Sequence, residues 1–191
     1  MSLIERIVAV HTAIFSRLQT ALDGWFLEAA ARFVFAGVLL LYYLNSAKTK
    51  VGSGFPDMFV PQVGAYAQIL PKTTESVGYD ISQIAFLPYG LMVLAGTYAE
   101  FILPVLIVLG LFTRLAGLGM IGFIAVQSYV DINFHGADEK TIGALFDRFS
   151  DSLISDQRTL WVFVLLVLVV RGGGALSLDY LLGRRFAPDR A

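Results

Sequence analysis

Four runs of apolar residues alternate with polar connections along the chain, at about residues 27–44, 86–112, 115–130 and 156–170. A helix needs about 20 predominantly apolar residues to cross the hydrocarbon core of a bilayer. The second run exceeds that length and carries a single charge, Glu100. The pattern therefore predicts one all-α domain over residues 1–191, an integral membrane four-helix bundle.

Three shorter segments have apolar residues on one helical face only. They cover about residues 3–22, 57–70 and 141–154, and charged or polar residues occupy the other face. Such helices suit the membrane–water interface, where one face contacts acyl chains and the other contacts water. We therefore expect three flanking amphipathic helices. We also expect four of their apolar side chains to be buried against the bundle or the lipid interface: Phe59, Val63, Phe146 and Phe149.

The turn at Thr113-Arg114 is too short for anything but an antiparallel pair of neighbouring helices. Four spans also put both termini on one side of the membrane. That side carries seven Lys/Arg, close to the span ends, against six on the other side. Because cytoplasmic segments are enriched in Lys and Arg, we expect both termini in the cytoplasm of a cell with an inner (plasma) membrane.

The composition supports a membrane protein and excludes several other classes. With 57% hydrophobic and 15% charged residues, the chain is far more apolar than an ordinary soluble domain. It has no cysteine, which excludes disulfides, thiolate catalysis, iron–sulfur clusters and cysteine-ligated zinc. A net charge of -1 without a basic block argues against nucleic-acid binding.

The charge within the second run is the first candidate for a functional site. A carboxylate near the bilayer centre costs about 2.5–3.5 kcal/mol, so we expect Glu100 to face the interior beside a partner. Pro104 has no N–H to donate to the carbonyl of residue 100. Arg32, near the start of the first run, could serve both the carboxylate and that carbonyl. In the alternative, this pair only fixes helix register, and Glu28 competes for Arg32 at i, i+4 spacing.

A second polar group lies at the outer end of the third run. Asp131 and His135 stand at i, i+4 spacing, and Gln127 lies one turn deeper. One histidine among carboxylates is a poor signal for zinc, so a solvated acidic rim is the preferred interpretation and no metal is expected. Gln127 either extends this site inward or hydrogen-bonds across helices.

Two further charges mark the side that holds the termini. Arg114 closes the turn between the second and third runs, where an arginine can bind lipid phosphate. Asp179 lies near the start of a short C-terminal helix with Ser177 as its cap, where the helix dipole favours a negative charge. Caps and interfacial arginines are common, so structural roles are expected for both residues.

Three landmarks stand between Arg32 and Leu182. They are the Arg32 that opens the first run, the stretch AEFILPVLIVLGLFTRLAG with its Gly-x-x-Thr-Arg turn, and the ending GGGALSLDYLL. Together they resemble the DoxX family of small four-helix membrane proteins. Where that family often has His-Gly-x-x-Lys after its first helix, this chain has Asn45-Ser46-Ala47-Lys48, which makes Asn45 and Lys48 secondary site candidates.

The resemblance implies a four-helix inner-membrane protein of a bacterium or archaeon. Family members are linked to quinone-coupled sulfur oxidation and to oxidative-stress complexes. We therefore expect a subunit or accessory of such a redox system, at most part of a quinone-linked oxidoreductase, with a quinone as the candidate cofactor. The expected partners are the lipid bilayer, a redox protein and further copies of the chain. The alternative is a non-catalytic scaffold or assembly subunit for a partner protein.

Overall fold

The computed structural model describes residues 2–186, and all regular secondary structure in that part of the chain is helical. The helices are α1 (Leu3–Leu22), α2 (Phe26–Phe35), α3 (Leu41–Lys48), α4 (Val63–Ile69), α5 (Pro71–Ser76), α6 (Leu91–Leu109), α7 (Thr113–Asn133), α8 (Glu139–Ile142), α9 (Arg158–Arg171) and α10 (Leu178–Phe186). β-pairing among the described residues is limited to one isolated bridge, between Val51 and Pro61. The predicted all-α class is confirmed.

Four helical stretches are long and apolar enough to cross a membrane, one for each predicted run. They are Phe26–Lys48, Phe86–Leu109, Thr113–Asn133 and Leu153–Arg171; three of them include a short π-helical segment, at Ala36–Leu40, Phe86–Gly90 and Leu153–Gln157. The fourth begins earlier than predicted because Ser152 and Asp156 cap each other. The Ser152 amide and hydroxyl donate to the Asp156 carboxylate, and the Asp156 amide donates to Ser152 Oγ.

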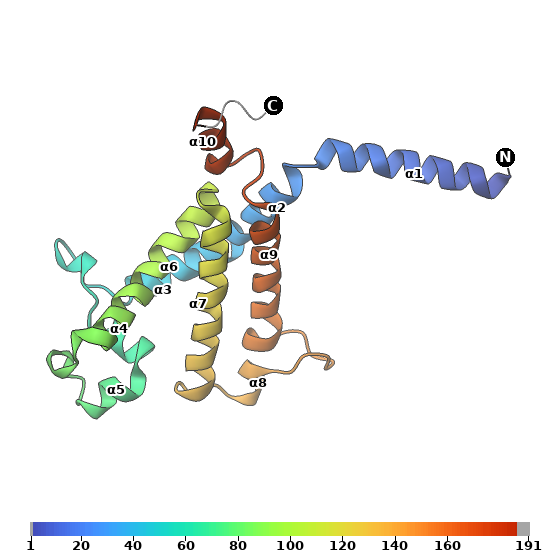
Figure 1. Cartoon of the computed structure of the whole chain (residues 1–191). Coiled ribbons are helices and arrows are strands. Elements are labelled where there is room, and N and C mark those ends of the chain that lie inside the picture. The colour runs from blue at the N-terminus through green and yellow to red at the C-terminus, as the bar shows by residue number, and fades with distance from the viewer. Residues whose placement is uncertain (1, 187–191) are drawn as a thin grey trace.

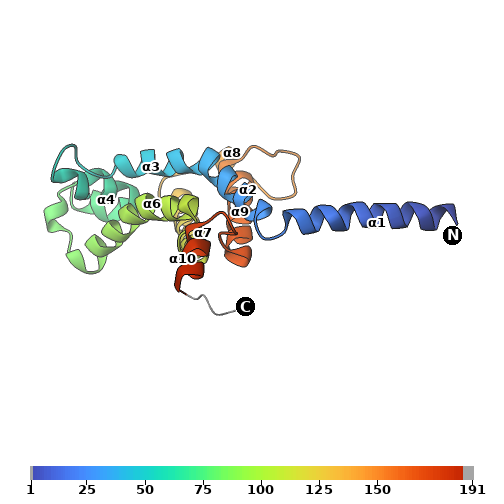
Figure 2. The same ribbon diagram turned by 90° about the horizontal axis from the view of Figure 1, so that it is seen from above.

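The four long helices pack as neighbours around one apolar core (Figure 1). α7 lies against α6 and α9, α2 lies against α9, and α3 lies against α6. Seen from above, α3 and α6 run away from α7 and α9 rather than parallel to them (Figure 2). The largest fully buried apolar side chains are Phe35, Tyr43, Ile107, Met120, Leu165 and Leu168. α1 and α10 lie at one end of this assembly and α4, α5 and α8 at the other, so both described ends of the chain share one end (Figure 1).

The antiparallel turn between α6 and α7 depends on a glycine. Gly110 ends α6 in the left-handed conformation, with φ of 68°, which glycine adopts without a steric penalty. A Cβ at this position would lie 2.6 Å from the Cβ of Ser177 and 2.9 Å from the Arg32 guanidinium. The turn therefore packs directly against the first span and the C-terminal segment.

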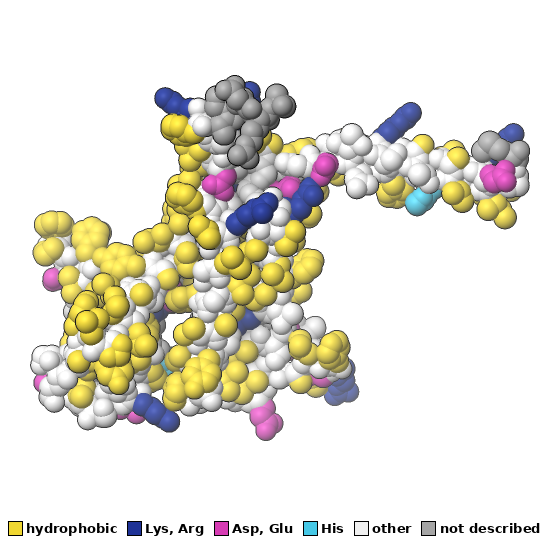
Figure 3. Space-filling model, in the orientation of Figure 1, with side chains coloured by type: hydrophobic (Ala, Val, Ile, Leu, Met, Phe, Trp, Pro, Cys, Tyr) yellow, Lys and Arg dark blue, Asp and Glu magenta, His cyan; other side chains and the backbone are white. Residues whose placement is uncertain are grey.

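The first predicted amphipathic segment is helical. α1 begins with a capping box, in which Ser2 Oγ accepts from the Glu5 amide and the Glu5 carboxylate accepts from the Ser2 amide. None of its residues is buried, and the helix projects sideways from the end of the long helices (Figures 1 and 2). In Figure 3, hydrophobic side chains gather mainly on the lower edge of α1, and arginines project from its upper edge.

The second predicted amphipathic helix, over residues 57–70, is broken. A 3-10 turn covers Asp57–Phe59, α4 begins only at Val63, and α5 follows from Pro71. The interruption has a local cause, because Pro61 cannot donate a helical hydrogen bond and instead pairs with Val51 in the isolated bridge.

The prediction of a third amphipathic helix, over residues 141–154, is wrong. α8 ends at Ile142 because Gly143 adopts a left-handed φ of 66°, and Phe146 also has a positive φ. The chain from there to Ser152 has no helix. Phe59, Val63, Phe146 and Phe149 are exposed rather than buried against the rest of the protein, and Phe146 is fully so. Apolar spacing alone therefore did not determine a helix here, since no buried surface holds that face.

Candidate functional site

A buried ion pair joins α6 to the end of the first span. Lys50 Nζ lies 2.8 Å from Glu100 Oε2, and each residue is 3% exposed. Nζ also donates to Ser46 Oγ at 2.9 Å, and that hydroxyl donates to Glu100 Oε1 at 3.5 Å. The expectation that Glu100 faces the interior beside a partner is confirmed, with Lys50 as that partner.

The predicted pairing of Arg32 with Glu100 is wrong. Arg32 Nη1 donates to the carbonyl of Val108 at 3.2 Å, and Nη2 donates to the carbonyl of Leu176. Because α6 runs antiparallel to α2, Arg32 is level with the end of α6. Glu100 lies eight residues before Val108, about 12 Å away along the helix axis. Arg32 therefore fastens the first span to the α6–α7 turn and to the C-terminal segment.

A pair of tyrosines connects the first span to α7. Tyr43, which is completely buried, donates to Gln127 Oε1 at 3.5 Å, and Gln127 Nε2 donates to the Tyr42 hydroxyl at 3.2 Å. Gln127 thus hydrogen-bonds across helices, one of the two interpretations left open by the sequence.

The second charged cluster is centred on Asp131. Its carboxylate accepts from Arg158 Nη2, and its other oxygen lies 3.0 Å from His135 Nδ1. Arg158 Nη1 donates to Ser128 Oγ at 2.8 Å. Asp131 and His135 are in contact, and their side chains are partly exposed, at 24% and 36%, as a solvated rim predicts. Asp131 also pairs with the buried Arg158, which is only 3% exposed. The early start of the fourth span puts Arg158 inside it rather than at its end.

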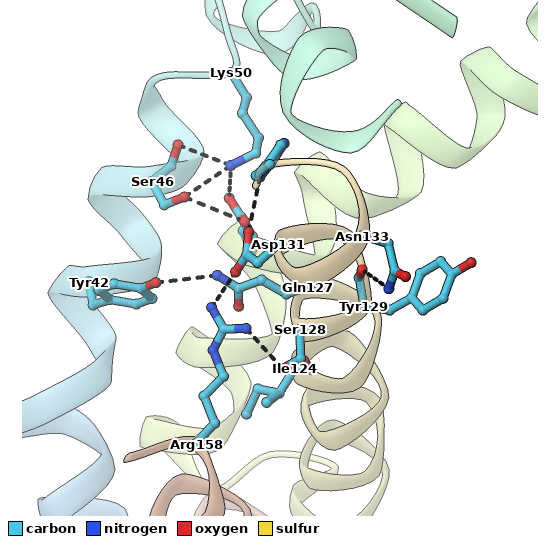
Figure 4. Close-up of polar contacts among 12 residues, drawn as sticks. Tyr42, Ser46, Lys50, Ile124, Gln127, Ser128, Tyr129, Asp131, Asn133 and Arg158 are labelled. Atoms are coloured by element: carbon cyan, nitrogen blue, oxygen red, sulfur yellow. Dashed lines mark hydrogen bonds and ion pairs between the residues drawn. The ribbon is translucent and has the colours of Figure 1, made fainter. Parts of the chain in front are cut away.

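These groups form one polar layer between the long helices (Figure 4). We define the polar layer as Tyr42, Tyr43, Ser46, Lys50, Glu100, Gln127, Ser128, Asp131 and Arg158. It contains two cations and two anions, so it is neutral when all four are ionised. Within this layer Arg158 Nε is buried and has no hydrogen-bond partner among the described residues, and the same holds for Oγ1 of Thr97, three residues before Glu100 in α6. In a low-dielectric interior such a layer can bind polar groups and hold protons at fixed positions.

Two of the remaining candidates, Arg114 and Asp179, lie at the opposite end of the long helices, where their contacts are structural. Ser177 Oγ accepts from the Tyr180 amide, which confirms it as a cap of α10. Asp179 is in the first turn of α10, but its carboxylate accepts hydrogen bonds from another helix, from the Phe112 amide and from the amide and hydroxyl of Thr113. It thereby caps α7 from 66 residues away. Arg114 lies against Gly172.

A further set of contacts at this end fixes the C-terminal end of α1. Arg171 donates to the carboxylates of Asp23 and Glu28, so Glu28 is not available to Arg32. The hydrogen bond and the charge of Arg171 hold the pKa of the Asp23 carboxyl below its usual range. The Ala175 amide donates to the carbonyl of Gly24 at 2.9 Å, which ties the C-terminal segment to the same point.

A cavity of about 510 Å³ lies beside the polar layer, on another face of α3 and α6. It is lined by Lys48, Val51, Gly52, Met58, Phe59, Tyr98, Phe101 and Ile102. Among the secondary candidates, Lys48 therefore belongs to this cavity and not to the polar layer. Asn45 is exposed, and its side chain makes no hydrogen bond with the residues that the structure describes.

The charged groups do not assemble into a metal site. In the described part of the chain, no three His, Asp or Glu side chains come close enough to hold a metal ion. Asp131 and His135 remain two potential ligands whose neighbour is the Arg158 guanidinium, a group that repels a cation. The chemistry that this site supports is hydrogen bonding and proton exchange.

Sequence reasoning missed Lys50, Ser46 and the burial of Arg158. One local signal could have revealed the first two, because Tyr43, Ser46 and Lys50 recur at i, i+3 and i+7 on one helical face at the end of an apolar run. No local pattern reveals that Arg158 meets Asp131, since that contact depends on how α7 and α9 pack.

Comparisons with known proteins identified no relative. No protein-family model matches the chain, and neither a curated protein nor a solved structure shows significant similarity to it.

Proposed function

We propose that the chain is a multi-pass inner-membrane protein of the DoxX type. In this proposal it has four spans, both termini lie in the cytoplasm, and it is a subunit or accessory of a quinone-linked or oxidative-stress redox system. The way the sequence landmarks meet supports the resemblance. Arg32 bonds the carbonyl of Leu176, and Asp179 bonds Thr113 in the Gly-x-x-Thr-Arg turn, so the three landmarks form one unit.

The amphipathic helix α1 supports the membrane arrangement. It leaves the long helices sideways at the end that also carries α10, and no described part of the chain buries its apolar face. An interfacial helix lies in this way, with its apolar face in the acyl-chain boundary and its arginines toward water. Tags at Met1 and Ala191 should report the cytoplasm, and a tag inserted after Phe146 should report the opposite side.

The observation that carries the redox proposal is the buried Lys50–Glu100 pair, in which Glu100 lies within the second span and Lys50 lies just after the end of the first. Ionisable residues inside a membrane are expensive and are commonly found where protons or ligands are handled. Quinone reduction and oxidation require proton uptake and release. A carboxylate held beside an ammonium and a hydroxyl can exchange a proton at a defined place next to the hydrocarbon phase.

The test compares Glu100→Gln with Glu139→Gln, the same change at an exposed residue of α8. The glutamine at position 100 keeps the shape and one acceptor oxygen but cannot titrate. We expect it to fold, yet to fail to complement a strain that lacks the gene, whereas Glu139→Gln complements fully. An organic extract of the purified wild-type protein should contain quinone.

Full complementation by a stable Glu100→Gln protein would contradict the proton-handling role. If the extract also lacked quinone and a partner protein co-purified, the non-catalytic scaffold would be the better account.

A further inference from the structure

The cavity beside α3 and α6 has apolar walls and a single cation at its edge. The walls come from Val51, Met58, Phe59, Phe101 and Ile102, and the polar side chains that line it are Lys48 and Tyr98. Tyr98 donates its hydroxyl proton to the carbonyl of Phe59 at 2.8 Å. The volume of the cavity lies within the range of about 300–1,000 Å³ that is typical of small-molecule sites. The cavity therefore suits a hydrocarbon body with one polar end.

The charge of Lys48 has no counter-charge in the described part of the chain. Lys48 is exposed, and its ammonium group forms no hydrogen bond or ion pair there, whereas that of Lys50, two residues on, pairs with Glu100. An ammonium beside apolar walls favours an anionic oxygen over a neutral one. Charge complementarity with Lys48 therefore indicates that the polar end of a ligand in this cavity is negatively charged.

The position of Lys48 suits the head group of an amphiphile. Lys48 is the last residue of α3, at the end of the first span, where head groups would lie. Because Lys50 pairs with Glu100, the end of α3 is level with that part of α6, and Lys48 lines the cavity together with Phe101 and Ile102. A head group on Lys48 would therefore bring its hydrocarbon chain against these two side chains.

The segment that covers the cavity is held in place. The Gly52 amide donates to the carbonyl of Asp57, and a Cβ on Gly52 would come within 2.6 Å of the Asp57 Cβ, so this close approach requires glycine. The Tyr98–Phe59 hydrogen bond then fastens the segment to α6. Met58 and Phe59 are therefore presented to a ligand from a fixed wall.

We propose that this cavity binds an anionic amphiphile of the bilayer, with its carboxylate or phosphate on Lys48 and its hydrocarbon chain against Phe101 and Ile102. The site is separate from the Lys50–Glu100 pair, because Glu100 belongs to the buried face of α6, which does not line the cavity. The inference thus goes beyond the proposed redox function and does not depend on it.

The test measures binding to the purified full-length protein in a maltoside detergent by equilibrium dialysis. The probes are oleate, dioleoylphosphatidylglycerol and oleyl alcohol, which has the chain of oleate with a neutral head. We expect one or both anionic probes to bind at least tenfold more tightly than oleyl alcohol, and the tighter of the two identifies the source as a free fatty acid or a phospholipid. Lys48→Gln should remove this preference, and Lys140→Gln, at an exposed site in α8, should retain it.

A second variant tests the cavity itself. Ile102→Trp should weaken binding of every probe at least tenfold by filling the space, whereas Leu91→Trp, elsewhere on an exposed part of α6, should not. Equal affinity for oleate, the phospholipid and oleyl alcohol, or unchanged binding by Ile102→Trp, would overturn the proposal. Glu100→Gln should bind the probes like wild type, so failure of this proposal and failure of the redox function are distinguishable.

Discussion

Lys50 and Glu100, 50 residues apart in the chain, meet at 2.8 Å between Nζ and Oε2 in the interior of the protein. Neither charge reaches water, so each is the other's main compensation. Buried pairs of this kind contribute little net stability, but removing one member leaves an uncompensated charge. The two residues must therefore be changed together if stability is to be separated from function.

This pairing predicts that the effects of the two substitutions on stability are strongly non-additive. Glu100→Leu alone should destabilise the protein by about 3–5 kcal/mol, because it leaves the Lys50 ammonium buried without a counter-charge. The double variant Lys50→Met/Glu100→Leu should recover most of that loss. Thermal unfolding in detergent of the two single variants and the double variant measures the coupling. A double variant as unstable as Glu100→Leu would contradict the pairing.

Removing the charge of Asp131 should destabilise the protein more than removing the charge of its partner Arg158. The Asp131 side chain is 24% exposed and also contacts His135, whereas that of Arg158 is only 3% exposed. Asp131→Leu leaves a buried guanidinium, so it should lower the melting temperature more than Arg158→Leu does. His135→Gln serves as the control and should have little effect. Equal losses for the two substitutions would indicate that Asp131 depends on Arg158 as much as the reverse.

The Asp179 carboxylate should be required for the start of α7. Asp179→Ala removes three hydrogen bonds to Phe112 and Thr113 and should cost at least about 1 kcal/mol, the usual value for a lost cap. Asp179→Asn retains one acceptor oxygen and should cost less. Hydrogen exchange measures the effect directly: the amides of Phe112 and Thr113 should exchange faster in the alanine variant. Exchange at wild-type rates would show that the turn does not need this cap.

One buried hydroxyl should lower the stability of the protein. Thr97 is completely buried in α6, and its Oγ1 has no hydrogen-bond partner among the residues that the structure describes. Thr97→Val keeps the shape and removes the unsatisfied group, so the melting temperature should rise, by an amount equivalent to about 1 kcal/mol. Thr74→Val is the matched control, because the Thr74 hydroxyl donates to the Leu70 carbonyl and its loss should not stabilise.

The anchor of α1 should weaken in acid. The pKa of Asp23 is lowered by Arg171, so its stabilising contribution is present above the unfolded value, about 3.9, and is lost as the pH falls through the folded value. A spin label at Thr20 should therefore keep the same mobility from pH 8 to about pH 4 and become more mobile below it. In Asp23→Asn the mobility should be raised already at neutral pH, and this step should disappear.

The hydrophobic pattern by itself determined the class of this protein and the positions of its four long helices. Runs of about 20 apolar residues have few alternatives to a helix that bonds its own backbone, so Phe86–Leu109 and Thr113–Asn133 follow from local sequence. The expectation that Glu100 turns inward followed equally from the cost of a charge among apolar neighbours. The helix predicted over residues 141–154 failed because its apolar spacing had no packed surface to stabilise it, and Gly143 ended the helix first.

Only the tertiary structure decided which charges meet. The sequence offered Arg32 for Glu100, but the antiparallel register of α2 and α6 puts Arg32 level with Val108 and brings Lys50 to Glu100 instead. The same holds for Asp179, whose partners at Phe112 and Thr113 come from a distant turn, and for Arg158 at Asp131. Local periodicity determines which face of a helix is buried. The contacts on that face depend on the relative depth and tilt of two helices, and these are set by the packing of every side chain between them.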